Sequence, residues 1–242
     1  MSLPTISEPS AMRDFPEARR VELDQLLALV TLFPGMTVLD LQAAGGFVAD
    51  EVHRILAGQV QCLCIEPSAV LRARINPVHQ AFADSVDHLQ SIRDRSCDLV
   101  LGLAGLHHSA LIARTLAEVY RVLRPDGVFA VCDIEAQSPI AKWLNEFVNV
   151  HSPQGHRGKF LSAQELQSAL SATGFKGVEV ARREVPWRFG DERAAQNFLR
   201  GLFGLRCDSA QLKIGMAEYL ECATLPTGYT VGWSLLYARG IK

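Results

Sequence analysis

Short apolar segments alternate with helical segments along the first half of the chain, and this alternation constrains the fold more than any other feature. The apolar runs cover residues 36–41, 60–65, 78–82, 97–101 and 128–134. Their lengths and β-branched content predict buried strands, and the periodicity between them predicts helices. Strands that alternate with helices form βαβ units, which build a parallel sheet with right-handed crossovers. The sequence therefore predicts an α/β fold.

The composition excludes several classes of protein. The chain has 242 residues, of which 48% are hydrophobic and 21% are charged, so one packed domain is expected. The formal net charge of −2 argues against nucleic acid or an anionic membrane as the main partner. No apolar run reaches the roughly 20 residues of a membrane span, and the N-terminus has no apolar signal core. Four of the six cysteines lie in strand-like runs, which indicates buried thiols in the cytoplasm.

The two ends of the chain are expected to differ from its centre. Residues 1–14 are polar and aperiodic, and we expect them to be flexible. Two helices are predicted at residues 191–204 and 208–220, followed by a final strand at 230–238. The two helices belong to an insertion over residues 190–226, which we expect to form a small helical lid.

Aromatic residues are concentrated in and near this insertion. They are Trp187, Phe189, Phe198, Phe203 and Tyr229. They either line an apolar ligand pocket under the lid or join the helices to the sheet. The second interpretation is favoured for Phe198 and Phe203.

Acidic residues and glycines follow the predicted strands, where an open parallel sheet binds its ligands. Asp40 ends the first strand, and Glu66 ends the second, twenty residues after Gly46. A carboxylate at this second position can accept two hydrogen bonds from a ribose diol, each worth about 1.5–3 kcal/mol. Gly45 and Gly46 allow the backbone to approach a ligand at a helix N-terminus. Taken singly, the same residues also suit a solvated strand end and an ordinary tight turn.

This ordered set resembles the class I S-adenosylmethionine-dependent methyltransferases, most closely the small-molecule enzymes with a type 11 methyltransferase domain. The matching segments are Val38–Leu41 with Gly46, Ile65–Ser68, Ala83–Ser85, Cys97–Val100 followed by Leu106–His108, and Tyr120–Gly127, which is the most specific. The resemblance implies one domain over residues 1–242 with a Rossmann-like, seven-stranded, mostly parallel sheet and helices on both faces. It also implies S-adenosylmethionine as the cofactor and a small molecule as the methyl acceptor.

The resemblance also assigns cofactor-binding residues. They are Asp40, Gln42, Ala44, Gly46, Glu66, Pro67, Asp84 and Ser85. By this likeness, the first motif embraces the methionine part of the cofactor. Glu66 holds the ribose, and Asp84 reaches the adenine amine.

The glycine loop departs from the family's pattern, which has glycines where this chain has Gln42 and Ala44. If either position needs a positive φ, a residue other than glycine costs about 1–2 kcal/mol. The departure supports an alternative function, in which a non-catalytic protein of this fold binds a nucleoside-like ligand or a protein partner. A nicotinamide-dependent dehydrogenase is disfavoured, because that class uses Gly-x-Gly-x-x-Gly and residues 42–47 read Gln-Ala-Ala-Gly-Gly-Phe.

Two histidines follow the fourth strand, near the position where the resemblance places the transferred methyl group. An imidazole can act as a general base near neutral pH, so His107 and His108 are predicted as catalytic residues, with capping or packing as the alternative. His151 and His156 lie in a polar segment that either closes over the acceptor or forms a solvated loop. No metal site is predicted, because the histidines and cysteines show no metal-ligand spacing.

Overall fold

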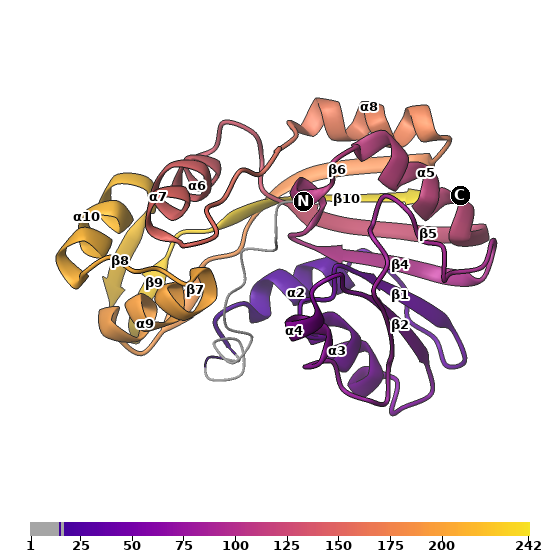
Figure 1. Ribbon diagram of the computed structural model, residues 1–242, viewed down its shortest axis with the longest axis horizontal. Coiled ribbons are helices and arrows are strands. Elements are labelled where there is room, and N and C mark those ends of the chain that lie inside the picture. The colour runs from indigo at the N-terminus through magenta and orange to yellow at the C-terminus, as the bar shows by residue number, and fades with distance from the viewer. Residues whose placement is uncertain (1–14, 16) are drawn as a thin grey trace.

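The structure is a computed structural model that describes residue 15 and residues 17–242. Its main sheet has seven strands in the order β3-β2-β1-β4-β5-β10-β6 (Figure 1). They are β3 (Gln80–Phe82), β2 (Gln61–Ile65), β1 (Thr37–Leu41), β4 (Cys97–Leu103), β5 (Leu123–Asp133), β10 (Ser234–Ile241) and β6 (Lys176–Glu184). The first five in this order pair in parallel, and β10 pairs antiparallel with β5 and β6. The predicted α/β fold with a seven-stranded, mostly parallel sheet is confirmed, whereas the flexible segment predicted at 1–14 lies outside the described residues.

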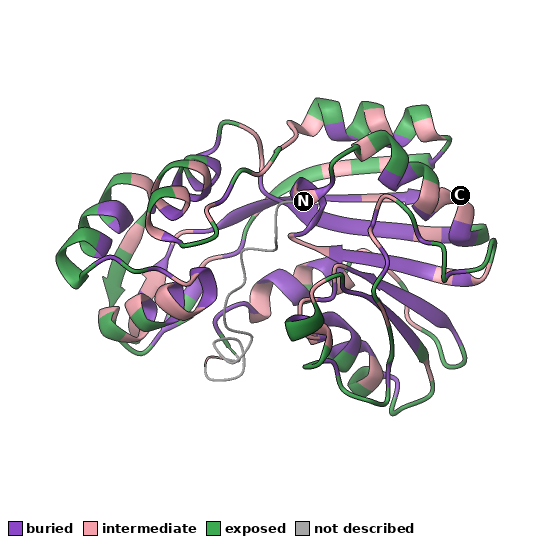
Figure 2. Cartoon of the chain, in the orientation of Figure 1, coloured by how far each residue is buried: buried purple, intermediate pink, exposed green. Residues whose placement is uncertain are grey.

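Helices cover both faces of this sheet (Figure 1). They are α2 (Arg20–Leu27) and α3 (Phe47–Ile55) on one face, and α5 (Ile112–Val122) and α8 (Ala163–Thr173) on the other. Successive strand residues point to opposite faces, so Val38 of β1 joins the core under α2 and α3, whereas Leu39 joins the core under α5 and α8. The central strands are therefore buried on both sides, as Figure 2 shows.

Local sequence explains where two of these helices lie. In α5, Leu116 and Val119 share the buried face, and the apolar stripe drives that face onto the sheet. In α8, the Ser162 hydroxyl accepts a hydrogen bond from the Glu165 backbone N–H, while the Glu165 carboxylate accepts one from the Ser162 N–H. This reciprocal cap starts the helix. Gly174, with φ of 106°, ends it.

A second, smaller layer lies beside the main sheet. It contains the three-stranded antiparallel sheet β7 (Trp187–Phe189), β9 (Gly228–Val231) and β8 (Cys222–Leu225), and the helices α9 (Glu192–Phe203) and α10 (Ser209–Tyr219). Three short helical segments adjoin it: α6 (Pro139–Lys142), the π-helix η2 (Trp143–Val148) and α7 (Asn149–His151). The two helices predicted in the insertion are present. The remaining short helices are α4 (Ala69–Arg72) and the 3-10 turn η1 (Leu106–His108).

The single final strand predicted at residues 230–238 is wrong. The chain leaves the small sheet at Val231 and enters the main sheet at Ser234. Between them, the Gly232 N–H donates to the Glu221 carbonyl, and the Trp233 carbonyl accepts from Val185. The apolar run therefore serves two sheets in succession.

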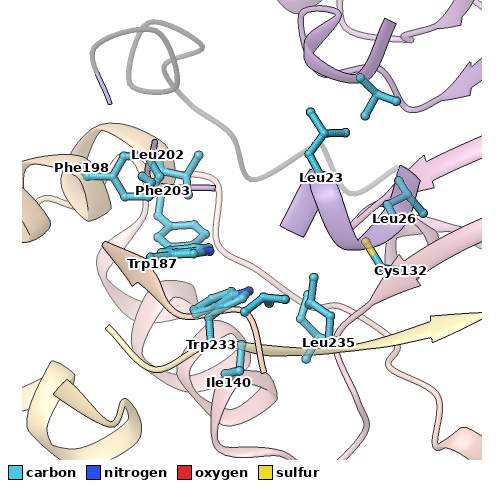
Figure 3. Close-up of a cluster of buried hydrophobic side chains, with 14 of the residues drawn as sticks. Leu23, Leu26, Cys132, Ile140, Trp187, Phe198, Leu202, Phe203, Trp233 and Leu235 are labelled. Atoms are coloured by element: carbon cyan, nitrogen blue, oxygen red, sulfur yellow. The ribbon is translucent and has the colours of Figure 1, made fainter. Parts of the chain in front are cut away.

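Large aromatic side chains join the small layer to the main sheet (Figure 3). The rings of Trp187 and Trp233 are stacked with centroids 3.9 Å apart, and Phe198 meets Trp187 edge-on. These rings belong to the same buried cluster as Leu23 and Leu26 of α2. Joining helix to sheet is therefore the correct interpretation for Phe198, and both layers share one core. None of the helices in the described part of the chain is long and apolar enough to cross a membrane.

Candidate active site

A cavity of about 600 Å³ opens at the carboxyl ends of β1, β2 and β4. Six of the predicted cofactor-binding residues are in its wall: Asp40, Gln42, Ala44, Glu66, Pro67 and Ser85. The two predicted catalytic histidines, His107 and His108, are also in the wall. On the opposite side, the small layer contributes Trp187 and Phe203, and Trp233 comes from the segment between β9 and β10. The cavity thus lies between the main sheet and the insertion, and its far wall is apolar.

Glu66 is fixed by the backbone at the end of β2. One carboxylate oxygen accepts a hydrogen bond from the Ala44 N–H at 2.9 Å, and the other accepts one from the Ser68 N–H at 2.8 Å. Burial raises the pKa of Glu66, although these two hydrogen bonds act in the opposite direction. Each oxygen retains an unused lone pair, so the side chain is oriented and can still accept hydrogen bonds from a ligand.

Asp40 lies deeper, at the end of β1. Its Oδ2 accepts one hydrogen bond, from the Ala49 N–H at 3.2 Å. The pKa of Asp40 is raised to about 7, mainly by burial; the nearby carboxylates of Glu66 and Asp50 act in the same direction, and the hydrogen bond from Ala49 opposes them. A ligand with a positive charge would lower the pKa of Asp40 again, because it would stabilise the ionised carboxylate.

The glycine loop is strained where the sequence departs from the family. Gln42 has φ of 60° and Ala44 has φ of 46°, and the following Gly45 and Gly46 are also left-handed. The cost expected for residues other than glycine therefore applies at both positions. The Gln42 amide lies against Gly105, where it fills the space that a side chain would need. Its buried Oε1 finds no donor among the described residues.

Two predicted cofactor-binding residues do not line the cavity. Gly46 caps the N-terminus of α3 and faces Ile75, so its contribution is to loop geometry. Asp84 is turned away, contrary to the prediction, because the Ser91 N–H and hydroxyl both donate to its carboxylate, at 2.7 and 2.9 Å. Asp87 lies in the wall instead and accepts hydrogen bonds from Ser109 and from the Ala110 N–H. The sequence gives one signal for a role of Asp87, namely its position three residues after Asp84.

His107 is held by Asp133, a residue that the sequence analysis missed. The His107 Nδ1 lies 2.6 Å from one Asp133 carboxylate oxygen, and the His107 backbone N–H donates to the other at 2.8 Å. Asp133 is the last residue of β5, so the rule that ligands bind at the carboxyl ends of strands could have found it. The pair fixes the imidazole with its Nε2 directed away from the carboxylate.

A third histidine joins the predicted pair. His156 Nε2 lies 3.4 Å from His107 Nε2, and the ring of His108 is 4.0 Å from that of His107 between centroids. Burial is the main cause that lowers the pKa of His108 to about 2 and that of His156 to about 3. His151 instead packs on Phe147 and is absent from the cavity wall. The polar segment therefore contributes His156 to the site. The sequence alone does not show that His156 lies near His107, because the two residues are 49 positions apart.

The chain matches a known protein family over most of its length. The family described as "Methyltransferase domain" matches residues 15–180, which is more than half of the chain. The chain belongs to the methyltransferase family. The resemblance to class I S-adenosylmethionine-dependent enzymes is thereby confirmed, and the non-catalytic alternative is not favoured.

Curated relatives of this methyltransferase act on different acceptors. An arsenite methyltransferase of Halobacterium salinarum is 28% identical over 173 residues, which are 67% of this chain and 43% of the relative. A malonyl-[acyl-carrier protein] O-methyltransferase of Geobacter sulfurreducens is 27% identical over 217 residues, 80% of each chain. The chain spans about half or less of the length of the first curated relatives that it matches.

Solved structures agree with the methyltransferase fold. The YcgJ protein of Bacillus subtilis has a TM-score of 0.67 at 17% identity and covers 91% of this chain and 97% of its own. A phosphoethanolamine-type N-methyltransferase of Haemonchus contortus, solved with S-adenosylhomocysteine, has a TM-score of 0.63 at 13% identity, over 91% of this chain and 52% of its own. At these identities the likeness establishes the fold of this methyltransferase alone.

Proposed function

We propose that this chain transfers a methyl group from S-adenosylmethionine to a small molecule bound in the cavity. The observation that carries the proposal is the position of Glu66, which two backbone N–H groups hold at the end of β2 in the same cavity as Asp40 and His107. A volume of about 600 Å³ with one apolar wall suits small molecules better than a protein segment.

The residues present fit the cofactor. The deeply buried carboxyl of Asp40 suits the ammonium group of its methionine part. Glu66 is oriented to accept hydrogen bonds from the two ribose hydroxyls. Pro67, Ser85 and Val86 line the part of the wall beyond Glu66, where the adenine ring would lie. When bound, S-adenosylmethionine supplies an electrophilic methyl group on a positively charged sulfur.

The protein's task is to place the acceptor in line with this methyl group. Trp187, Phe203 and Trp233 exclude water from the acceptor side of the cavity and limit the acceptor's rotation. Orientation of this kind can supply about 7–11 kcal/mol of the barrier reduction. Where the acceptor must lose a proton, His107 is the group that can take it, because Asp133 stabilises the resulting imidazolium.

The chemistry of the wall favours some acceptors over others. Arg157 and Lys159 are exposed at the rim of the cavity, and neither forms an ion pair with the acidic residues that the structure describes. They favour an acceptor with an anionic group. No cysteine of the described chain lines the cavity, so soft acceptors such as arsenite, which bind thiolates, are disfavoured.

The experiment that tests this function has two arms. Calorimetric titration with S-adenosylhomocysteine, with NAD as the control, is expected to give micromolar binding of the former alone, which corresponds to about −8 kcal/mol. S-adenosylhomocysteine release is then measured with panels of anionic and neutral acceptors. No heat at millimolar ligand would overturn the assignment of the cofactor, whereas binding without turnover on any panel would support the non-catalytic alternative.

The strained loop provides a prediction of its own. The double change Gln42→Gly, Ala44→Gly is expected to tighten S-adenosylhomocysteine binding several-fold, because it removes two side chains from the wall and relieves two positive-φ positions. The titration is repeated on the double variant and on each single variant. Weaker binding in Gln42→Gly alone would show instead that the Gln42 amide accepts a hydrogen bond from the ligand.

Binding is also expected to depend on pH through Asp40. Because its pKa is about 7 in the free protein and a bound ammonium group favours the carboxylate, affinity rises as pH increases through 7. Loss of one proton on binding predicts about tenfold weaker S-adenosylhomocysteine binding at pH 6 than at pH 8. In Asp40→Asn the dependence should disappear, and a slope that persists in this variant would assign it to another group.

A further inference from the structure

Three imidazoles converge at the acceptor side of the cavity. They come from η1 and from the segment after α7, and one ring nitrogen from each of His107, His108 and His156 lies within 4.8 Å of the other two. All three residues line the cavity. The two rings of His107 and His156 are buried, and His108 is partly exposed toward the cavity. The cluster is therefore accessible from inside the site.

The tautomer of His107 is determined by its neighbours. Asp133 accepts hydrogen bonds from the backbone N–H groups of His107 and Ile134, at 2.8 and 2.7 Å, so its oxygens act as acceptors. The contact of 2.6 Å with His107 Nδ1 then requires the hydrogen on Nδ1. In the neutral ring, Nε2 of His107 then carries a lone pair.

The same reasoning applies to His156 through Asn145. The Asn145 amide is oriented by Gly158, whose N–H donates to Oδ1 at 2.8 Å and whose carbonyl accepts from Nδ2 at 3.0 Å. The atom 2.9 Å from His156 Nδ1 is therefore the amide oxygen, and Nδ1 must donate to it. Nε2 of His156 carries a lone pair as well.

Two lone pairs thus face each other across 3.4 Å, which is unfavourable unless something positive lies between them. The distance of 3.4 Å between the two Nε2 atoms also matches the spacing of two ligands on one metal ion. Two imidazole nitrogens bound to one zinc ion at 2.0–2.1 Å with a tetrahedral angle lie about 3.3–3.4 Å apart. Outer partners of this kind, a carboxylate and an amide on the distal ring nitrogens, are typical of histidines that bind metals.

We propose that His107, His108 and His156 form a binding site for one divalent transition-metal ion, with Zn²⁺ as the ion that fits best. Three neutral imidazoles leave one tetrahedral position open, as in catalytic zinc sites. This position faces the cavity, because all three ligands line it. The prediction that the chain has no metal site overlooked this cluster, because His156 lies 49 residues from His107.

The open position also indicates the class of acceptor, an inference that rests on the proposed function. A metal ion there binds an oxygen or sulfur atom of the acceptor as an anion, and the proton that this atom loses goes to solvent. The acceptor lone pair then forms the new bond to the methyl carbon, while the carbon–sulfur bond breaks and its electron pair stays on sulfur. His107 is a ligand in this case and does not act as the base.

Metal binding is tested first, on the untagged protein after treatment with a chelator and desalting. Co²⁺ is titrated and its visible absorption recorded, because tetrahedral Co²⁺ has intense bands, and Zn²⁺ affinity is measured by competition with a chelating dye. We expect one equivalent to bind, with at least hundredfold weaker affinity in His107→Ala and His156→Ala. His88→Ala, which removes an exposed histidine outside the cavity wall, should bind as the unchanged protein does. No tetrahedral band in the unchanged protein would overturn the proposal and leave a shared proton between the rings.

Two further variants keep the result interpretable if a buried histidine is needed for folding. His108→Ala changes the partly exposed ligand. Asn145→Ala leaves all three imidazoles in place but removes the partner of His156 and of the Gly158 backbone. Tenfold to hundredfold weaker metal affinity is expected for Asn145→Ala. Metal affinity equal to that of the unchanged protein in both variants would contradict the metal site. S-adenosylhomocysteine titration on the same samples separates the two proposals, since loss of metal binding with intact nucleoside binding contradicts only the metal site.

Discussion

Glu66→Ala is expected to weaken S-adenosylhomocysteine binding at least tenfold. The variant removes a buried carboxylate that two backbone N–H groups orient, and with it the two charge-assisted hydrogen bonds that we propose it accepts from the ribose. Each is worth about 1.5–3 kcal/mol, and a loss of 1.4 kcal/mol already corresponds to a factor of ten. Calorimetric titration of both proteins at the same pH measures the difference.

The matched control for this prediction is Glu179→Ala. Glu179 is exposed on β6, outside the cavity wall, so its removal changes the net charge equally and should leave the affinity unchanged. Glu66→Gln adds a second comparison, because an amide keeps the shape of the side chain but lacks the charge. Unchanged binding in Glu66→Ala would remove this residue from the cofactor site, and with it the observation on which the proposed function depends.

Trp187→Ala is expected to lower the free energy of unfolding by about 3–5 kcal/mol, the usual cost of removing a fully buried tryptophan. Its ring is stacked on Trp233, and its indole N–H donates to the buried Glu22 carboxylate at 2.6 Å. The variant therefore leaves both a cavity and a carboxylate oxygen with one donor fewer. Urea denaturation monitored by circular dichroism measures the change in the free energy of unfolding.

Two comparisons separate packing from hydrogen bonding in this result. Trp187→Phe keeps an aromatic ring but loses the N–H, so a loss of about 1–3 kcal/mol is expected. Ile214→Ala on α10 changes a side chain that is 66% exposed and should stay within about 0.5 kcal/mol of the unchanged protein. A loss below 1 kcal/mol for Trp187→Ala would mean that the small layer and the main sheet do not share a core.

The sequence predicted those parts of the structure that depend on local pattern. Strand–helix alternation predicts the parallel sheet, because the helix of a βαβ unit provides the crossover that lets its two strands run parallel. The prediction brought Asp40 and Glu66 to one cavity wall because strand ends are visible in the sequence and meet at one edge of the sheet. The glycine loop was found for the same reason, and its positive φ angles match the strain expected for Gln42 and Ala44.

The sequence failed where a side chain depends on partners that come from elsewhere in the chain. The Asp84 carboxylate accepts hydrogen bonds from Ser91, because the path of the loop between β3 and β4 brings Ser91 beside it. His156 reaches His107 only because Asn145 and Gly158 fix the segment after α7. Such contacts have no period and no fixed spacing in the sequence, so no local pattern predicts them. The same holds for the break at Gly232, where an unbroken apolar run passes from one sheet to the other.

The position of β10 has a consequence for the order in which the molecule can assemble. β10 lies between β5 and β6, and β6 has no other neighbour in the main sheet. Strands β1 to β5 find their parallel partners within residues 37–133. β6 must wait as an unpaired strand until residues 234–241 have been made. Pairing of β10 therefore joins β6 to the sheet and, through the adjoining Trp233, completes the far wall of the cavity.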